Sequence, residues 1–214
     1  MVGYDKHPSV ELNRKYKGYQ GQDPNSAKFL FFGLDANFAA DIEETPIFKE
    51  LIEYLTDGVE YWKRMNRHHP FLSPAYEKGS GYKYHYQFSK LELTSEYADK
   101  VSFIELLDCP TSGNTSYTRL MQLLNMDYLK KLDQLMLSIR GDKAVYITKG
   151  VYSQLYKINQ KYGCFEWLPE PQKFQRNKLY TICDRKDLKI YVITHFSDSI
   201  SRTHLAEIER TIRA

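Results

Sequence analysis

The chain has 214 residues, of which 42% are hydrophobic and 27% charged, and its formal net charge is +3. This size suits one soluble enzyme-sized domain, and no apolar stretch approaches the length of a membrane span. The N-terminus lacks the apolar core of a signal peptide, so we expect a cytoplasmic protein without a membrane partner. The charge permits binding to nucleic acid but is too small to indicate it.

The three cysteines, Cys109, Cys164 and Cys183, lack the spacing of a disulfide framework or of a zinc site. We therefore expect no metal and no other cofactor. We also expect a monomer.

Residues 1–26 are rich in Tyr, Lys, Gly and Pro, which predicts an arm packed on a single domain at 27–214. The segment 28–38, KFLFFGLDANF, opens that domain with an apolar run that ends at a glycine before Asp35 and Asn37. Such a run is typical of a strand buried on both faces, and ligand sites in open α/β sheets lie just past such strand ends. Asp35 is therefore the first candidate for chemistry, the alternative being an aspartate that caps a helix or a turn.

The next segment, PIFKELIEYLTDGVEYWKRM at 46–65, carries apolar residues at helical spacing. Thr45-Pro46 resembles an N-cap followed by proline at the first helical position, and Gly58 weakens or ends the first part of the helix. The basic and aromatic stretch at 64–88 predicts a loop-like insertion that touches the substrate.

Residues 101–116, VSFIELLDCPTSGNTS, repeat the pattern of an apolar strand followed by polar groups, here Glu105 and a loop with Gly113 and Asn114. Amphipathic helices are predicted over 116–139, and KAVYIT at 143–148 predicts a buried strand that leads into a helix at 150–160. Strands that alternate with helices favour a mainly parallel sheet in a three-layer α/β/α domain.

Residues 179–194, LYTICDRKDLKIYVIT, predict a hairpin with its turn at Arg185-Lys186-Asp187, and a helix at 204–213 closes the chain. The second strand leads to His195 and Ser197. Strand ends would thus bring Asp35, Glu105 and His195 to one rim, which indicates an acid/base or anion-stabilising site.

In their order and spacing, these segments resemble the motifs of the uracil-DNA glycosylase superfamily. Gly33-Leu34-Asp35-Ala36-Asn37-Phe38 resembles the first motif, GQDPYH in the best-known branch, and His195-Phe196-Ser197 resembles the start of the second, HPSPLS. Residues 103–110, FIELLDCP, with Gly113-Asn114, are similar to ITNVVKCRPPGN of the thermophile branch. The resemblance extends from about residue 27 to the C-terminus and implies a three-layer fold that acts on DNA. The cysteine spacing does not predict the iron–sulfur cluster of the thermophile branch.

Two other strings copy parts of these motifs, Gly21-Gln22-Asp23-Pro24 and His7-Pro8-Ser9. The glycosylase aspartate must follow a buried strand, and RKYKGYQ before Gly21 is too polar for one. We therefore interpret both strings as chance matches.

The resemblance implies a role for the matched residues, because an N-glycosidic bond breaks with positive charge on the sugar and negative charge on the base. Asp35 would orient water and face the sugar, and His195 would stabilise the leaving base. Phe38 or Phe48 would stack on the flipped base. The alternatives are a core histidine bonded to backbone and phenylalanines that belong to the core.

Two residues depart from the family pattern. Glu105 stands where the family has the asparagine that reads uracil, and an ionised glutamate offers only hydrogen-bond acceptors, which leaves the preferred base open. The alternative for Glu105 is a structural carboxylate paired with Arg or Lys. Asn37 replaces the tyrosine that blocks the thymine methyl group, so that space is predicted to be open.

After His195 the family places a loop whose apolar residue wedges into the duplex while its neighbours hold phosphates. Ser197, Ile200 as the wedge and Arg202 as a phosphate contact are the matching candidates. The alternative is an ordinary helix start, with Ser199 or Ser201 as N-cap and Ile200 as a hydrophobic staple.

The sequence thus predicts a DNA glycosylase-like hydrolase that cleaves the N-glycosidic bond of a flipped, modified base. Two alternatives stay open. One is a nucleosidase-like hydrolase of free nucleosides that uses the same site without a wedge. The other is a non-catalytic nucleic-acid-binding module in which Asp35 and His195 are structural.

Overall fold

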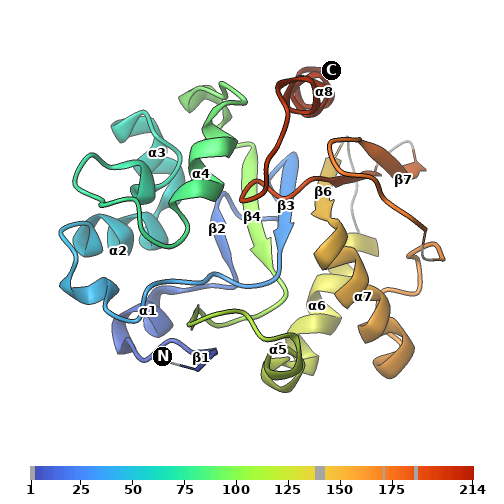
Figure 1. Cartoon of the computed structure of the whole chain (residues 1–214), viewed down its shortest axis with the longest axis horizontal. Coiled ribbons are helices and arrows are strands. Elements are labelled where there is room, and N and C mark those ends of the chain that lie inside the picture. Colours follow the sequence, from blue (N-terminus) through green and yellow to red (C-terminus); the bar gives the residue numbers. More distant parts are fainter. Residues whose placement is uncertain (1–2, 138–142, 171, 186–187) are drawn as a thin grey trace.

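The computed structural model describes residues 3–137, 143–170, 172–185 and 188–214. In these ranges the centre of the molecule is a mixed sheet with strand order β2-β4-β3-β6-β8-β7 (Figure 1). Its strands are β2 (Tyr19–Gly21), β3 (Phe29–Gly33), β4 (Val101–Glu105), β6 (Lys143–Thr148), β7 (Tyr180–Arg185) and β8 (Leu188–Ile193). The four inner strands run parallel, and the two edge strands are antiparallel to their neighbours. The predicted α/β class with a mainly parallel sheet is confirmed.

Helices flank both faces of this sheet (Figure 1). On one face pack α6 (Met126–Leu137) and α7 (Lys149–Tyr162), and on the other α3 (Gly58–Met65), α4 (Tyr82–Ser89) and α8 (Arg202–Arg213). The apolar run of β3 explains the arrangement, because successive side chains of a strand point to opposite faces. Leu30 and Phe32 belong to the first core cluster, whereas Phe29 and Phe31 belong to the second.

The remaining elements surround the sheet. A third core cluster joins α1, α2 and the segments beside them, and β1 pairs antiparallel with β5. These elements are β1 (Asp5–Lys6), α1 (Val10–Lys15), η1 (Ile42–Glu44), α2 (Phe48–Thr56), η2 (Pro70–Leu72), η3 (Ser95–Tyr97), β5 (Thr111–Ser112) and α5 (Tyr117–Leu123).

The helix predicted over 46–65 begins later than expected and is split in two. Thr45 ends the 3-10 helix η1 and does not cap α2, which begins at Phe48. Asp57 ends α2 and caps α3, because its side chain accepts a hydrogen bond from the Glu60 N–H at 2.9 Å. Gly58 is the first residue of α3, where an added Cβ would lie 2.9 Å from the backbone of Gly21.

The predicted loop over 64–88 is also corrected, since it contains η2 and most of α4. The sequence of α4, YKYHYQFS, contains few strong helix formers, so local propensity gives little sign of it. Tertiary packing stabilises this helix instead, because His85 and Phe88 are buried.

The first residues form more than an arm, because Tyr19–Gly21 pairs with β4 as an edge strand. The segment before Gly21 does not form a strand buried on both faces, but its last residues form this edge strand, which the sequence did not predict because an edge strand does not need an apolar run. Gly21 pairs with Ser102, near the start of β4, so the Gly21-Gln22-Asp23-Pro24 string leaves the sheet at the rim opposite Glu105.

The predicted hairpin at 179–194 is present as β7 and β8, which pair antiparallel. Of its predicted turn, Lys186 and Asp187 lie outside the described residues. Cys109, Cys164 and Cys183 are free thiols. None of the helices in the described ranges is long and apolar enough to cross a membrane.

Candidate active site

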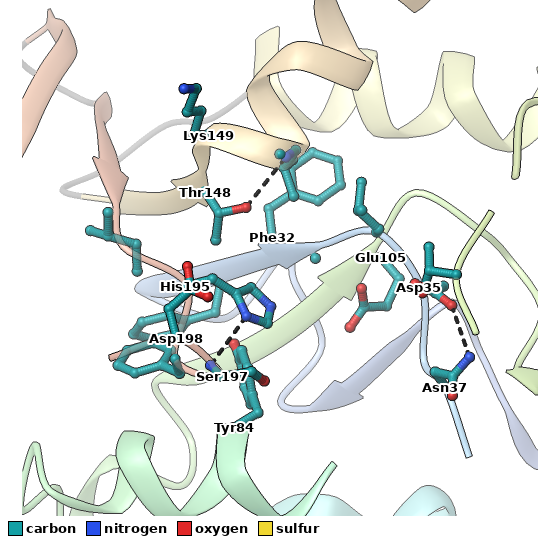
Figure 2. A pocket seen from close by; sticks show the side chains of 18 of the residues that line it. Phe32, Asp35, Asn37, Tyr84, Glu105, Thr148, Lys149, His195, Ser197 and Asp198 are labelled. Carbon is teal, nitrogen blue, oxygen red and sulfur yellow. Dashed lines mark hydrogen bonds between the residues drawn. The ribbon is translucent and has the colours of Figure 1, made fainter. Parts of the chain in front are cut away.

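A pocket of about 970 Å³ opens where the parallel strands end. Residues that follow β3, β4 and β8 line it, together with the start of α7 and one side of α4 (Figure 2). The chain passes from β3 to β4 on one side, whereas β6 and β8 are added on the other side of β3. The pocket therefore lies at the point where the strand order reverses, which is the usual ligand site of open α/β sheets.

Most of the residues predicted from the sequence meet in this pocket. Those that line it are Asp35, Asn37, Phe38, Glu105, Gly113, Asn114, His195 and Ser197. Three others, Phe48, Ile200 and Arg202, are absent from its lining.

These three residues lie elsewhere for local reasons. Phe48 is half-buried at the start of α2 and packs on the third core cluster. Ile200 packs on the same cluster as Leu205, and the Ser201 side chain caps α8 by accepting a hydrogen bond from the backbone of His204. These contacts match the helix start with a hydrophobic staple, and they leave Ile200 half-buried. Arg202 is exposed in the first turn of α8.

Asp35 is held by three donors, and all of their hydrogen bonds go to Oδ2. Thr111 Oγ1 donates at 2.5 Å, the hydroxyl of Tyr4 at 2.9 Å and Asn37 Nδ2 at 3.4 Å. Backbone pairing brings Thr111 to this place, because its N–H donates to the Ala36 carbonyl at 2.9 Å. These contacts fix the carboxylate of Asp35 in one orientation.

Asn37 is fixed as firmly as Asp35. Its Nδ2 lies 3.0 Å from the carbonyl oxygen of Gly113 and 3.1 Å from Thr111 Oγ1. Gly113 itself has a φ of 83°, which a glycine adopts without strain. Asn37 therefore ties the loop at Gly113 and Asn114 to the end of β3, and this pairing shapes one wall of the pocket.

Glu105 ends β4 directly beside Gly33 of β3, its partner in the parallel register. It is only 8% exposed, and its Oε2 has no hydrogen-bond partner among the described residues. Burial raises the pKa of Glu105 well above its ordinary value, and the charge of Asp35 adds to this effect. The predicted pairing with Arg or Lys is not found in the described part of the chain.

His195 follows β8 at the mouth of the pocket and presents one ring nitrogen as a donor. Its Nδ1 accepts a hydrogen bond from the Ser197 N–H at 3.1 Å, so the proton of the neutral ring is on Nε2. Desolvation lowers the pKa of His195, against the opposing effects of Asp198 and Asp35, which favours the neutral form. The ring lies beside Tyr84 of α4, with 5.3 Å between centroids (Figure 2).

The sequence did not reveal the residues that hold His195 in place. His204 is fully buried in α8, and its Nε2 accepts a hydrogen bond from the backbone N–H of Thr194 at 3.1 Å. Asn177 accepts from the Ser201 N–H at 2.9 Å and donates to the Ser199 carbonyl at 3.3 Å. A buried histidine in an amphipathic helix and an asparagine after a Pro-rich stretch are weak signals without the structure.

The pocket is lined by charges of both signs. Asp35 and Glu105 lie beside the ends of β3 and β4, whereas exposed cations lie along α7 and in the segment before β7. These cations are Lys149, Lys157, Arg176 and Lys178, and Arg176 lies 3.4 Å from the carboxylate of Asp198, which also lines the pocket. Thr148 caps α7 by accepting a hydrogen bond from the Val151 N–H at 3.3 Å.

The described residues contain no cluster of three or more His, Cys, Asp or Glu side chains arranged to hold a metal ion. Comparison with protein-family models and with curated proteins finds no match for this chain.

Proposed function

We propose that this chain is a DNA glycosylase-like hydrolase of the uracil-DNA glycosylase type, which cleaves the N-glycosidic bond of a base flipped out of DNA. The observation that carries the proposal is the shared pocket of Asp35 and His195, in which a fixed carboxylate and an N–H donor face the same space. The motif resemblance supports the assignment.

Each group fits one end of the bond that breaks. The sugar gains positive charge and the departing base gains negative charge as the bond lengthens. The three donors from described residues occupy Oδ2 of Asp35, which leaves Oδ1 to bind water beside the sugar. His195, neutral and protonated on Nε2, donates a hydrogen bond to the oxygen of the leaving base.

The pocket also suits the size and charge of a nucleotide. Its volume of about 970 Å³ is within the range of small-molecule sites. Phe38 is only 2% exposed and belongs to the third core cluster, so it matches the alternative of a core phenylalanine better than that of a residue that stacks on the base. The exposed lysines of its lining, Lys149, Lys157 and Lys178, can contact the phosphates that flank the flipped base.

The test is base release from oligonucleotides that contain uracil, hypoxanthine, xanthine or an alkylated base, followed by cleavage at the abasic site. Asp35→Asn is expected to lower base release by about two or more orders of magnitude. Asp23→Asn is the matched control, since Asp23 belongs to the similar string at the opposite rim, and it should release base at the normal rate. Salt-sensitive DNA binding without release of any base would favour the non-catalytic module instead.

One observation favours a second candidate, the nucleosidase-like hydrolase. Ile200, the residue expected to wedge into a duplex, is half-buried and packs on the core. A nucleosidase would use Asp35 and His195 without a wedge. Hydrolysis of free nucleosides, with no release of base from DNA, would support this candidate over the glycosylase.

A further inference from the structure

The hydroxyl group of Tyr84 is an unused hydrogen-bond donor in the wall of the pocket. Tyr84 is half-buried and lines the pocket, and its hydroxyl has no hydrogen-bond partner among the described residues. Two other tyrosines, Tyr16 and Tyr54, also have hydroxyls without a partner, but the protein fully encloses those oxygens. The oxygen of Tyr84 is not enclosed in this way, so a ligand in the pocket can reach it.

Packing alone does not account for a tyrosine at this position. The ring of Tyr84 packs on other rings of the pocket wall, with 5.3 Å between its centroid and that of Phe196 and 6.4 Å between it and that of Phe103. A phenylalanine would make the same contacts. Buried tyrosine hydroxyls usually find a partner, as that of Tyr128 does when it donates to the Gly18 carbonyl at 2.8 Å. The hydroxyl of Tyr84 is therefore available to a ligand.

The neighbours of Tyr84 hold it in place. α4 begins after Gly81, which has a φ of 82° and whose added Cβ would lie 2.2 Å from the ring of Phe71. His85, the next residue after Tyr84, stacks on the buried His69 with 3.6 Å between centroids. Contacts on both sides of Tyr84 thus fix α4 against the pocket, and a donor that is fixed before the reaction stabilises developing charge most effectively.

Tyr84 reaches toward His195, the donor that the proposed function assigns to the leaving base (Figure 2). The centroids of the two rings are 5.3 Å apart, and the rings are inclined at 52°. They come from different elements, α4 and the residues after β8, and both line the pocket. Because hydrogen-bond donors hold an acceptor at about 2.7–3.0 Å, one oxygen atom of a ligand can lie within reach of both.

Both groups are neutral donors. Burial raises the pKa of Tyr84 above its ordinary value, and the carboxyl group of Glu105 adds to this effect, so the phenol keeps its proton. Burial also lowers the pKa of His195, which favours its neutral form. Such donors bind a neutral carbonyl oxygen weakly and an oxygen that gains negative charge more strongly.

We infer that Tyr84 is a further catalytic residue, which donates a hydrogen bond to the same oxygen of the leaving base as His195. This inference rests on the proposed function and requires a base that carries a carbonyl oxygen. As the N-glycosidic bond breaks, its electron pair goes to the base, a water molecule bonds to the sugar, and one proton of that water goes to Asp35. The O–H bond of Tyr84 stays intact, and the base leaves as an anion that takes its proton from solvent.

The first experiment compares base release by the wild type, Tyr84→Phe and Tyr86→Phe in single turnovers, with the base that the wild type releases fastest. Loss of the Tyr84 hydroxyl should slow release by about a hundredfold, the scale of one oxyanion donor. Tyr86 lies on the same helix, is exposed and does not line the pocket, so its variant should match the wild type. Both variants keep the ring, and urea denaturation should show wild-type stability. Release at the wild-type rate by Tyr84→Phe would overturn the inference.

The second experiment separates a donor to the leaving base from a structural role. The same base is compared with a more acidic halogenated form, such as 5-fluorouracil beside uracil. A more acidic base is a better leaving group and needs less stabilisation of its negative charge. Tyr84→Phe should therefore slow release of the halogenated base by a smaller factor. Equal factors for the two bases would show that the hydroxyl does not act on the leaving base.

The third experiment does not depend on catalysis. The label 3-fluorotyrosine replaces Tyr84, and its ¹⁹F signal is followed while an oligonucleotide with 2′-fluoro-2′-deoxyuridine, which resists hydrolysis, is added. The signal should shift on binding, whereas the same label in place of Tyr86 should give an unchanged signal. No shift at Tyr84 with saturating oligonucleotide would overturn the contact.

The two proposals fail in different ways. A shift at Tyr84 without release of any base from any oligonucleotide would keep Tyr84 as a ligand contact and remove the glycosylase. Base release that is equally fast in the wild type and in Tyr84→Phe would keep the glycosylase and remove Tyr84 from its mechanism.

Discussion

A Cβ atom on Gly33 would lie 2.1 Å from Oε2 of Glu105 and 2.8 Å from its carboxyl carbon. Gly33 does not have a positive φ, so the need for glycine here is steric and not conformational. Gly33 and Glu105 thus form one structural arrangement, in which the absent side chain leaves room for the acid.

Gly33→Ala should displace the Glu105 carboxyl group from its place in the pocket. We expect a loss of about 1–3 kcal/mol in the free energy of unfolding, typical of an overpacked core, together with slower base release. Urea denaturation and base release test both effects. Gly3→Ala is the control, because no atom lies within 4 Å of its added Cβ and Gly3 does not line the pocket, so neither property should fall.

The orientation of Asp35 should depend on Tyr4 and Thr111. Tyr4→Phe and Thr111→Val each remove one donor to Oδ2, and a displaced carboxylate should slow base release by about tenfold to a hundredfold. Tyr76→Phe removes a hydroxyl that donates to the Ser80 carbonyl at 2.7 Å, outside the pocket, and serves as control. Normal rates in both test variants would show that these donors do not position Asp35.

The buried acid should make the protein less stable as the pH rises. The pKa of Glu105 is raised in the folded state, so the folded chain holds a proton that the unfolded chain releases above its ordinary carboxyl pKa. Stability should then fall by about 1.4 kcal/mol per pH unit from that ordinary pKa up to the folded pKa. Urea denaturation between pH 7 and pH 8, above the range in which the buried histidines affect stability, should show this fall in the wild type and not in Glu105→Gln.

Glu50→Gln should change the pH dependence of stability in the opposite direction, so it serves as the comparison for Glu105→Gln. Burial alone would raise the pKa of Glu50, but hydrogen bonds from Tyr61 and Arg67 lower it. Glu50 therefore stabilises the fold above its ordinary pKa, and this stabilisation is lost as the pH falls. If stability depended on pH in the same way in Glu105→Gln and in Glu50→Gln, the assignment of a protonated Glu105 and an ionised Glu50 to the folded chain would be contradicted.

Three buried histidines should make the fold sensitive to acid. Burial lowers the pKa of His68 to about 3, and it lowers those of His69 and His85 well below the ordinary value. The unfolded chain takes up protons below about pH 6.5 that the folded chain does not bind, so stability falls as the pH drops. His68→Gln removes one of these protons, so the loss of stability with falling pH should become smaller by about 1.4 kcal/mol per pH unit. A Glu105→Gln protein as stable at pH 5 as at pH 7 would rule out the effect, because that variant lacks the opposing contribution of the buried acid.

The inner strands could be predicted from the sequence because burial on both faces requires continuous apolar runs, and FLFF and KAVYIT are such runs. Asp35, Glu105 and His195 could be located for a related reason, since each follows a strand that ends at the same rim. Tyr19–Gly21 could not, because an edge strand carries no such pattern.

The parts of the site that depend on long-range packing also escaped prediction. Tyr4 and Thr111 are 31 and 76 residues from Asp35, and although Thr111 lies in the segment 101–116, nothing in the sequence links either residue to Asp35. The protonation of Glu105 is set by side chains from several elements that meet only in the folded chain. Sequence patterns identify the residue type at a strand end, whereas its charge depends on what surrounds it.

The short strand β2 covers the outer edge of β4. Every residue of β4 is buried, and among the described residues the strand that pairs with its outer edge is Tyr19–Gly21, in antiparallel orientation. Without that cover, an apolar strand would present a row of unpaired N–H and carbonyl groups, which is a template for pairing with another copy. A chain shortened by its first 21 residues would thus be expected to aggregate through β4 while Asp35, Glu105 and His195 were all still present.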